Sequence, residues 1–286
     1  MLSVLRLFRE SAEFVASDVL SRIGRQAVTG SAFSQARYKI DPLFFSDLCD
    51  ISSEAYEGFA SARWKGYRIL AGDGSTLNLP ASKQVRGHFG VDANSPKKSL
   101  ARIFLVYDVH TGFTLRAGIG RMSTGEGGML EDCLDRMPSR PDDLLVLDRN
   151  FGFFNTVSRL SAEGRPFCIR LSTGITDFAK GVMADGRTDF ITDWVPSRKE
   201  RETAGTSEAV RVRVTKAVLE TGETELLVSS LTDTGSFSNE DLVELYGMRW
   251  GVEEGIYGKK KIMQSGSIKY LNNQSVSKVT LQYHFT

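Results

Sequence analysis

The chain has 286 residues, of which 41% are hydrophobic and 25% charged, a composition that is ordinary for a globular protein of two modest domains or one large domain with an insertion. No apolar run approaches the roughly 20 residues that a membrane helix needs, and charged residues interrupt the apolar N-terminus, unlike a signal peptide. The net charge of +1 argues against a protein that coats DNA. We therefore expect no membrane partner.

Residues 1–60 are predicted to form an N-terminal helical region. Apolar residues recur at helical spacing as far as Gly24, which marks a helix end. A second helix is expected near Ser31, a possible cap, and a third after Asp41 and Pro42. The three helices are either a DNA-binding unit or a supporting bundle, and their net acidity favours neither strongly.

Residues 61–171 change to a strand-like period. The segment GYRILAGDGSTLNLP is predicted to be a strand, a turn and a second extended piece, and RIFLVYDVHTGFTLRAGIG to be a hairpin. After a glycine-rich loop, helices then alternate with two short apolar strands, LLVLD and PFCIRL, of the kind that is buried on both faces. Three antiparallel strands followed by two β–α alternations are the ribonuclease H-like order.

Residues 172–237 are acidic and contain two alternating strands around a Thr-Gly turn, so we expect a β-rich insertion. In the last segment, 238–286, a long helix is predicted from Ser238, with Asp241 as its capping partner three residues later. The predicted fold class is α/β: a ribonuclease H-like core with a β-rich insertion and an N-terminal helical region.

Two carboxylates are expected at the ends of apolar strands. Asp73 is followed by glycine, and Asp148 by Arg149 and Asn150. Such a carboxylate is held rigidly yet reaches solvent, and two on neighbouring strands can share divalent cations, since hard oxygen ligands suit Mg²⁺ or Mn²⁺. For either residue taken singly, a turn-forming aspartate is the better interpretation.

The predicted C-terminal helix favours a shared metal site at Asp73 and Asp148 over two unrelated turn-forming aspartates. Tyr246, Arg249, Glu253 and Lys260 lie at offsets 0, 3, 7 and 14, and at about 100° per residue they share one helical face. A solvated surface with incidental salt bridges is the alternative. The charge distribution agrees with a site for a polyanion, because basic residues outnumber acidic ones seven to two in 61–100 and six to two in 246–286, although chance over such short windows explains this nearly as well.

These residues carry a family resemblance. YGMRWGVEEGIYGKK contains Tyr-x2-Arg-x3-Glu-x6-Lys and resembles the signature of DDE transposases of the insertion sequence 4 type. LAGDGSTLNLP resembles the first Asp motif of that family, and LLVLDRNF resembles the second. The resemblance extends over nearly the whole chain from about residue 30. Family members usually continue beyond the Tyr-Arg-Glu-Lys helix, so we expect this chain to be shortened at its C-terminus.

The resemblance implies that Asp73, Asp148 and Glu253 are catalytic residues and ligands of two Mg²⁺ or Mn²⁺ ions in a transposase. One ion would lower the pKa of the attacking water and the other would stabilise the leaving 3′ oxygen. The implied partner is double-stranded DNA with terminal inverted repeats, bound by a homodimer in a synaptic complex at the bacterial nucleoid.

The resemblance also implies DNA contacts. Tyr246 and Arg249 match positions that hold the DNA backbone near a flipped base, and Lys260 matches a DNA-contacting lysine. A flipped base needs an aromatic side chain to stack on, and Trp194 is our candidate, with a core position in a small β domain as the alternative. Glu126 either supports the carboxylate site or only begins a helix.

Two other functions stay open from the sequence. The chain is either an active transposase, a shortened non-catalytic DNA-binding remnant, or a metal-dependent nuclease without strand transfer. The three cysteines are widely spaced and fit neither a zinc site nor a disulfide framework. We therefore expect a reducing cytoplasm and core positions for all three: Cys49, Cys133 and Cys168.

Overall fold

The computed structural model describes residues 12–37, 39, 41, 43–57, 62–79, 82–92, 95–218 and 222–249. The helices are α1 (Ala12–Arg22), α2 (Gly30–Arg37), α3 (Leu43–Glu57), α4 (Lys83–Phe89), α5 (Glu126–Asp135), α6 (Phe154–Ala162), α7 (Asp177–Ala184), α8 (Arg198–Ala204), α9 (Asn239–Met248) and a short 3-10 helix, η2 (Arg149–Phe151). The strands are β1 (Arg68–Leu79), β2 (Val91–Asp92), β3 (Ser95–Asp108), β4 (Thr114–Arg121), β5 (Asp143–Leu147), β6 (Phe167–Leu171), β7 (Asp189–Trp194), β8 (Val210–Val218) and β9 (Thr224–Ser229). No helix in these ranges is both long and apolar enough to cross a membrane.

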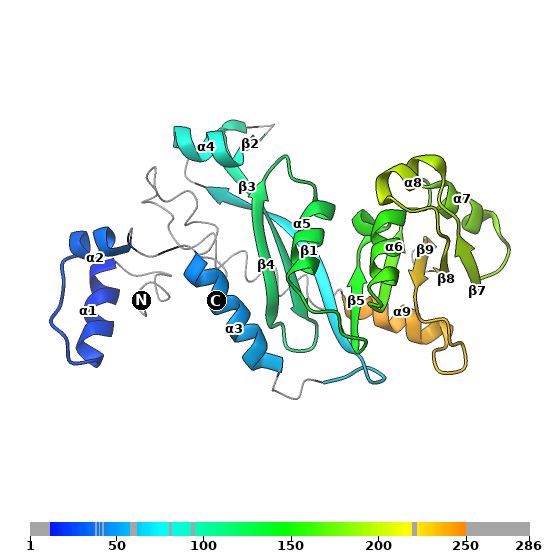
Figure 1. The fold of residues 1–286 in the computed structure, drawn as a ribbon, viewed down its shortest axis with the longest axis horizontal. Helices are drawn as coiled ribbons and strands as arrows, with labels where there is room; N and C mark the ends of the chain where they lie inside the picture. Colours follow the sequence, from blue (N-terminus) through cyan, green and yellow to red (C-terminus); the bar gives the residue numbers. More distant parts are fainter. Residues whose placement is uncertain are drawn as a thin grey trace.

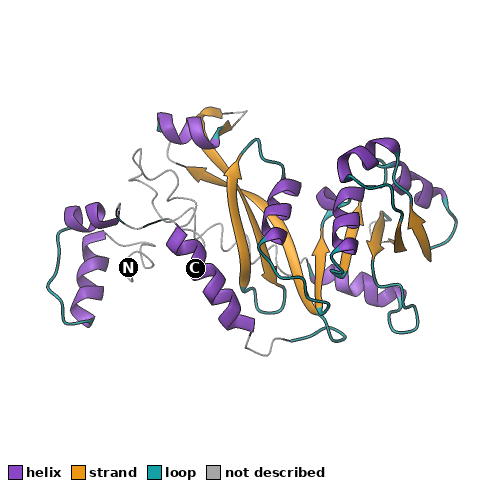
Figure 2. Ribbon diagram, in the orientation of Figure 1, coloured by secondary structure: helices purple, strands orange, loops and turns teal. Residues whose placement is uncertain are grey.

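The described strands form one sheet with helices on both faces (Figures 1 and 2). Its first part has the order β4-β3-β1-β5-β6, in which β1, β3 and β4 are antiparallel and β5 and β6 run parallel to β1. This is the predicted ribonuclease H-like order, and the α/β fold class is confirmed. A connection between parallel strands needs a crossover, and α6 provides it between β5 and β6.

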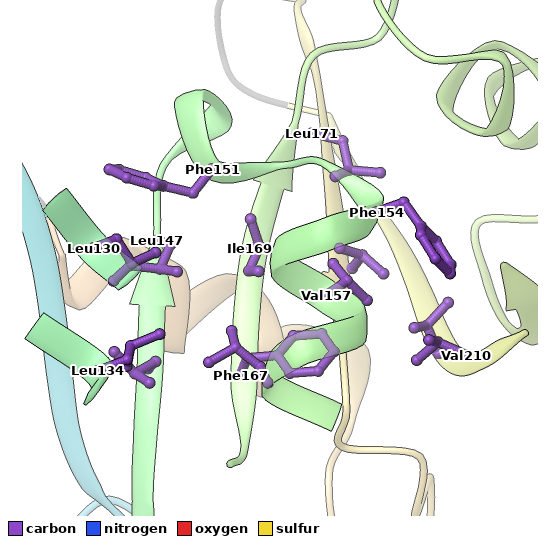
Figure 3. Close-up of a cluster of buried hydrophobic side chains, with 14 of the residues drawn as sticks. Leu130, Leu134, Leu147, Phe151, Phe154, Val157, Phe167, Ile169, Leu171 and Val210 are labelled. Atoms are coloured by element: carbon purple, nitrogen blue, oxygen red, sulfur yellow. The ribbon is translucent and has the colours of Figure 1, made fainter. Parts of the chain in front are cut away.

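The largest hydrophobic cluster lies on the face covered by α5 and α6. Side chains of these helices point at β5 and β6, and Phe151 of η2 closes the upper end (Figure 3). The opposite face is covered by α9, where Leu242 and Leu245 pack against Ile69 and Val146. Burial on both faces explains why β5 and β6 are mostly apolar, with Arg170 the one charged residue within β6.

The strand prediction for residues 68–79 needs one correction. The segment is a single strand without a turn, because β1 stays paired with β3 from Leu70–Asp108 as far as Leu79–Ser99. Its pairing with β5, in contrast, ends at Gly72–Leu147. Asp73 therefore lies within β1, at the point where only the β5 side of the strand becomes unpaired.

The segment 172–237 contains three strands and also two helices, α7 and α8, that the sequence did not predict. Its strands extend the core sheet, since β9 pairs antiparallel with β6, β8 with β9 and β7 with β8. Helix α4, which follows the Ser82 cap, was not predicted either.

In the part of residues 1–60 that the structure describes, three helices are present, as predicted. The oxygen that caps α2 belongs to Thr29, whose Oγ1 accepts a hydrogen bond from the backbone N–H of Ala32, and not to Ser31. Helix α3 packs on β4, where Ser53 donates a hydrogen bond to the carbonyl of Leu115 and Tyr56 stacks on Phe113. The three cysteines are buried and free, as expected.

Candidate active site

Asp73 and Asp148 lie where the parallel pairing between β1 and β5 ends. The last register pair between β1 and β5 is Gly72 with Leu147, so the two aspartates occupy the next position of each strand. Neighbouring strands are about 4.8 Å apart. The fold therefore brings together two carboxylates that are 75 positions apart in the sequence.

Each carboxylate is oriented by a nearby backbone N–H. Oδ1 of Asp73 accepts a hydrogen bond from Gly74 (2.9 Å), and Oδ1 of Asp148 accepts one from Asn150 (2.9 Å). Asp148 is the N-cap of η2, an arrangement typical of aspartate at a helix start. In both residues one oxygen is directed by the main chain, which fixes the orientation of the group.

The electrostatic environment of Asp73 is shared with its neighbours. Partial burial raises the pKa of Asp73 to about 6; the Gly74 N–H opposes the shift, the negative charge of Asp148 adds to it, Arg249 opposes it and Glu126 adds to it. Three charged side chains from β5, α5 and the end of α9 therefore act on the Asp73 carboxylate.

Neighbouring side chains pack closely against the two glycines beside Asp73. A Cβ atom on Gly72 would lie 2.9 Å from Leu147 and from Phe104, and one on Gly74 would lie 2.6 Å from Cδ of Glu126. These distances are shorter than van der Waals contact. The sequence suggested a turn here, but the glycines allow neighbouring side chains to reach the backbone of β1.

Helix α9 brings Arg249 toward this edge of the sheet. Both Ser238 and Asp241 contribute to its capping box, as predicted. Arg249 follows the last helical residue and keeps helical dihedral angles. Its guanidinium lies 5.4 Å from the ring centroid of Tyr246, and it is buried and lowers the pKa of Asp73.

Residues 64–278 match the family described as the transposase DDE domain. The match covers most of the chain. The chain belongs to this family. Among solved structures, the DDE domain is similar to piggyBac transposase in a cryo-EM structure of a synaptic complex with hairpin DNA, at 12% identity and a TM-score of 0.45. That similarity covers 74% of this chain and 47% of the other, so this chain spans about half its length. No curated protein matches the sequence.

The donors in this DDE domain suit the divalent metal ions that the family typically uses. Asp73 and Asp148 offer carboxylate oxygens, which Mg²⁺ and Mn²⁺ prefer, and the raised pKa of Asp73 reflects burial beside negative charge that a cation would offset. Within the described ranges, no three His, Cys, Asp or Glu side chains lie close enough to hold a metal ion. The third predicted ligand, Glu253, and the predicted DNA contact Lys260 lie outside those ranges.

Three of the predicted DNA contacts are buried: Tyr246, Arg249 and Trp194. Tyr246 is 1% exposed and belongs to the hydrophobic cluster between α9 and the sheet. Its ring therefore packs in the core beside Arg249. The sequence had placed Tyr246 on a polar helix face that projects to solvent, and the structure does not show this.

Trp194 needs a correction. Its side chain is 0% exposed, stacks on Phe178 at 4.2 Å between ring centroids and meets Phe154 edge to face. No face of the indole is open to a nucleobase. The alternative interpretation, an anchor of the core, fits this structure and the flipped-base role does not.

Three polar residues at this edge received little or no weight from the sequence. Glu126 begins α5, Asn150 lies in η2 and Arg102 lies in β3, and hydrogen bonds connect them. The sequence contained a weak signal for two of them, since Glu126 follows a glycine-rich loop and Asn150 lies two residues after Asp148. Nothing in the local pattern indicated Arg102, because a strand residue acquires its neighbours only through the sheet register.

Proposed function

We propose that this DDE domain is a transposase of the insertion sequence 4 type, which cuts the ends of its element and joins them to other DNA. The adjacent position of Asp73 and Asp148, with Arg249 acting on Asp73, is the observation that carries the proposal. Two carboxylates and a guanidinium near one end of the parallel strand pair suit phosphodiester chemistry, in which catalysis consists of positioning and charge stabilisation.

Asp73, Asp148 and Glu253 are the proposed ligands of two Mg²⁺ or Mn²⁺ ions. When bound, the ions supply an activated water and stabilise the leaving 3′ oxygen. The contribution of this chain is to hold the two aspartates on rigid strands, with one oxygen of each fixed by a backbone N–H. The buried Arg249 balances part of their negative charge.

The proposed substrate is double-stranded DNA with terminal inverted repeats, held by a homodimer. We assign Arg249 and Lys260 to contacts with the phosphate backbone, which guanidinium and ammonium groups recognise. Tyr246 is assigned to the same contact region. Because its ring is buried and lies beside the guanidinium, its part in this structure is to support Arg249.

The test is cleavage of a labelled duplex that carries the inverted repeats flanking the gene, with Mg²⁺ or Mn²⁺. We expect nicks at the repeat ends followed by joined or hairpin products. Asp73→Ala, Asp148→Ala and Glu253→Ala are each expected to abolish cleavage and to retain DNA binding. Glu131→Ala, which removes an exposed carboxylate from α5, is the matched control.

The products separate this proposal from the two other functions. Cleavage without joined or hairpin products would identify a metal-dependent nuclease. DNA binding without any cleavage would identify a non-catalytic remnant. Cleavage that persists in one of the three alanine variants would remove that residue from the site.

A further inference from the structure

Glu126 lies where the two aspartate-bearing segments meet. Its carboxylate fills the space in front of Gly74, the residue after Asp73, where a Cβ atom would lie 2.6 Å from Cδ of Glu126 and would displace this side chain. On its other side it faces η2, whose N-cap is Asp148. One side chain from α5 thus contacts the segments that follow both aspartates.

Both oxygens of Glu126 are occupied. Oε1 accepts a hydrogen bond from Nη1 of Arg102 (2.8 Å), and Oε2 accepts one from Nδ2 of Asn150 (3.3 Å). The ion pair with Arg102 is about three-quarters buried on both sides, so β3 holds the carboxylate in place. With both oxygens engaged, the Glu126 carboxylate is suited to orienting its neighbours.

The path from Glu126 to Asp148 has one intermediate residue. Glu126 holds the side chain of Asn150, and the backbone N–H of Asn150 holds Oδ1 of Asp148. We propose that Glu126 is a positioning residue that fixes Asp148 relative to Asp73 through Asn150 and Gly74. The inference rests on the proposed function, because it assigns the aspartates to a metal site.

The experiment measures Mn²⁺ affinity of the full chain by calorimetry, without DNA. Removal of a residue that orients a metal ligand typically weakens affinity about 10-fold or more, so we expect about a 10-fold loss for Glu126→Ala and for Asn150→Ala. Glu126→Gln keeps one oxygen for Asn150 and is expected to lose less than Glu126→Ala. The double variant Glu126→Ala, Asn150→Ala is expected to have the same Mn²⁺ affinity as the single variant that binds Mn²⁺ less tightly, because the two residues act on one path.

Two controls separate positioning from simple loss of structure. Glu131→Gln changes an exposed carboxylate of the same helix and is expected to bind Mn²⁺ like the unchanged chain. Asn150 is exposed, so Asn150→Ala tests the same path in a folded protein even if Glu126→Ala does not fold. Thermal melting of every variant identifies those that lose structure.

Two results would overturn the inference. The first is unchanged Mn²⁺ affinity in Glu126→Ala or Asn150→Ala. The second is a loss in Glu126→Ala as complete as in Asp73→Ala while Asn150→Ala binds normally, since Glu126 would then be a ligand.

The same measurements separate this inference from the proposed function. If Mn²⁺ binds, Glu126→Ala weakens it and no DNA is cut, the proposed function fails and the positioning role stands. If Asp73→Ala and Asp148→Ala bind Mn²⁺ as tightly as the unchanged chain, the metal site fails and the role of Glu126 fails with it.

Discussion

The register that brings Asp73 beside Asp148 begins at a buried ion pair. Arg68 and Asp143 are the first register partners of β1 and β5, and the guanidinium donates two hydrogen bonds to the carboxylate, at 2.7 and 2.5 Å. Both side chains are almost fully buried. Asp143→Asn leaves the arginine charge buried without its counter-charge, a change that costs about 3–5 kcal/mol of unfolding free energy.

The neighbouring pair Arg63–Asp142 is a matched control. Its N–O distance is 2.6 Å, but its side chains are 42% and 48% exposed, so Asp142→Asn should cost less than about 1 kcal/mol. For a chain of this size each kcal/mol shifts the melting temperature by about 2 °C. We therefore expect Asp143→Asn to melt roughly 6–10 °C lower and Asp142→Asn to melt within about 2 °C of the unchanged chain.

Circular dichroism during thermal and urea unfolding measures both variants. A third variant, Arg68→Met with Asp143→Leu, replaces the pair by apolar side chains and should recover most of the lost stability. Equal melting temperatures for Asp143→Asn and Asp142→Asn would refute the reasoning, because burial would then make no difference to the pair.

Three further predictions follow from individual contacts. Gly74→Ala should displace the flexible end of Glu126, lowering Mn²⁺ affinity in calorimetry while the melting temperature changes little; unchanged affinity would contradict the close-packing argument. Trp194→Ala should cost about 3–5 kcal/mol in urea unfolding without weakening DNA binding per folded molecule, whereas a selective loss of DNA affinity would restore a recognition role. Partial burial raises the pKa of Glu163, but the hydrogen bonds from Arg159 and Arg165 together lower it by more than burial raises it. The pKa of Glu163 in the folded protein is therefore below the usual 4.5. The ionised group stabilises the fold above that value, and the stability difference between the unchanged chain and Glu163→Gln should therefore be full at pH 7 and shrink as the pH falls below about 4; a difference that is constant between pH 3 and 7 would exclude this ion pair as the cause.

The core order of strands was predictable because burial leaves a direct trace in the sequence. β5 and β6 are short apolar runs bounded by polar residues, and such runs are strands buried on both faces. Helix α9 was predictable at its start, because Ser238 and Asp241 form a local capping box. These signals depend on residues close together in the chain.

The errors arose where the structure depends on distant partners. The segment around Asp73 looked like a turn because Gly72 and Gly74 are typical turn residues, yet the long pairing with β3 keeps β1 extended. Tyr246 lies on the predicted polar face of its helix, but the sheet packs against that side as well. The sequence gives the period of a helix and not the width of the surface that covers it.

Asp73 and its two glycines show how one short motif is constrained from both faces of the sheet. Side chains alternate along a strand, and Ile69 packs against α9, so Asp73 points to the same face of the sheet as Ile69, the face that Arg249 approaches. Gly72 and Gly74 belong to the other face, where Leu147, Phe104 and the Glu126 carboxylate occupy the positions of their missing Cβ atoms. A larger residue at either glycine would displace these side chains on the face opposite Asp73 and would disturb the carboxylate site without changing Asp73 itself. The Gly-Asp-Gly sequence is therefore a packing requirement as well as a chemical one, and it makes α5 part of the machinery that positions the carboxylates.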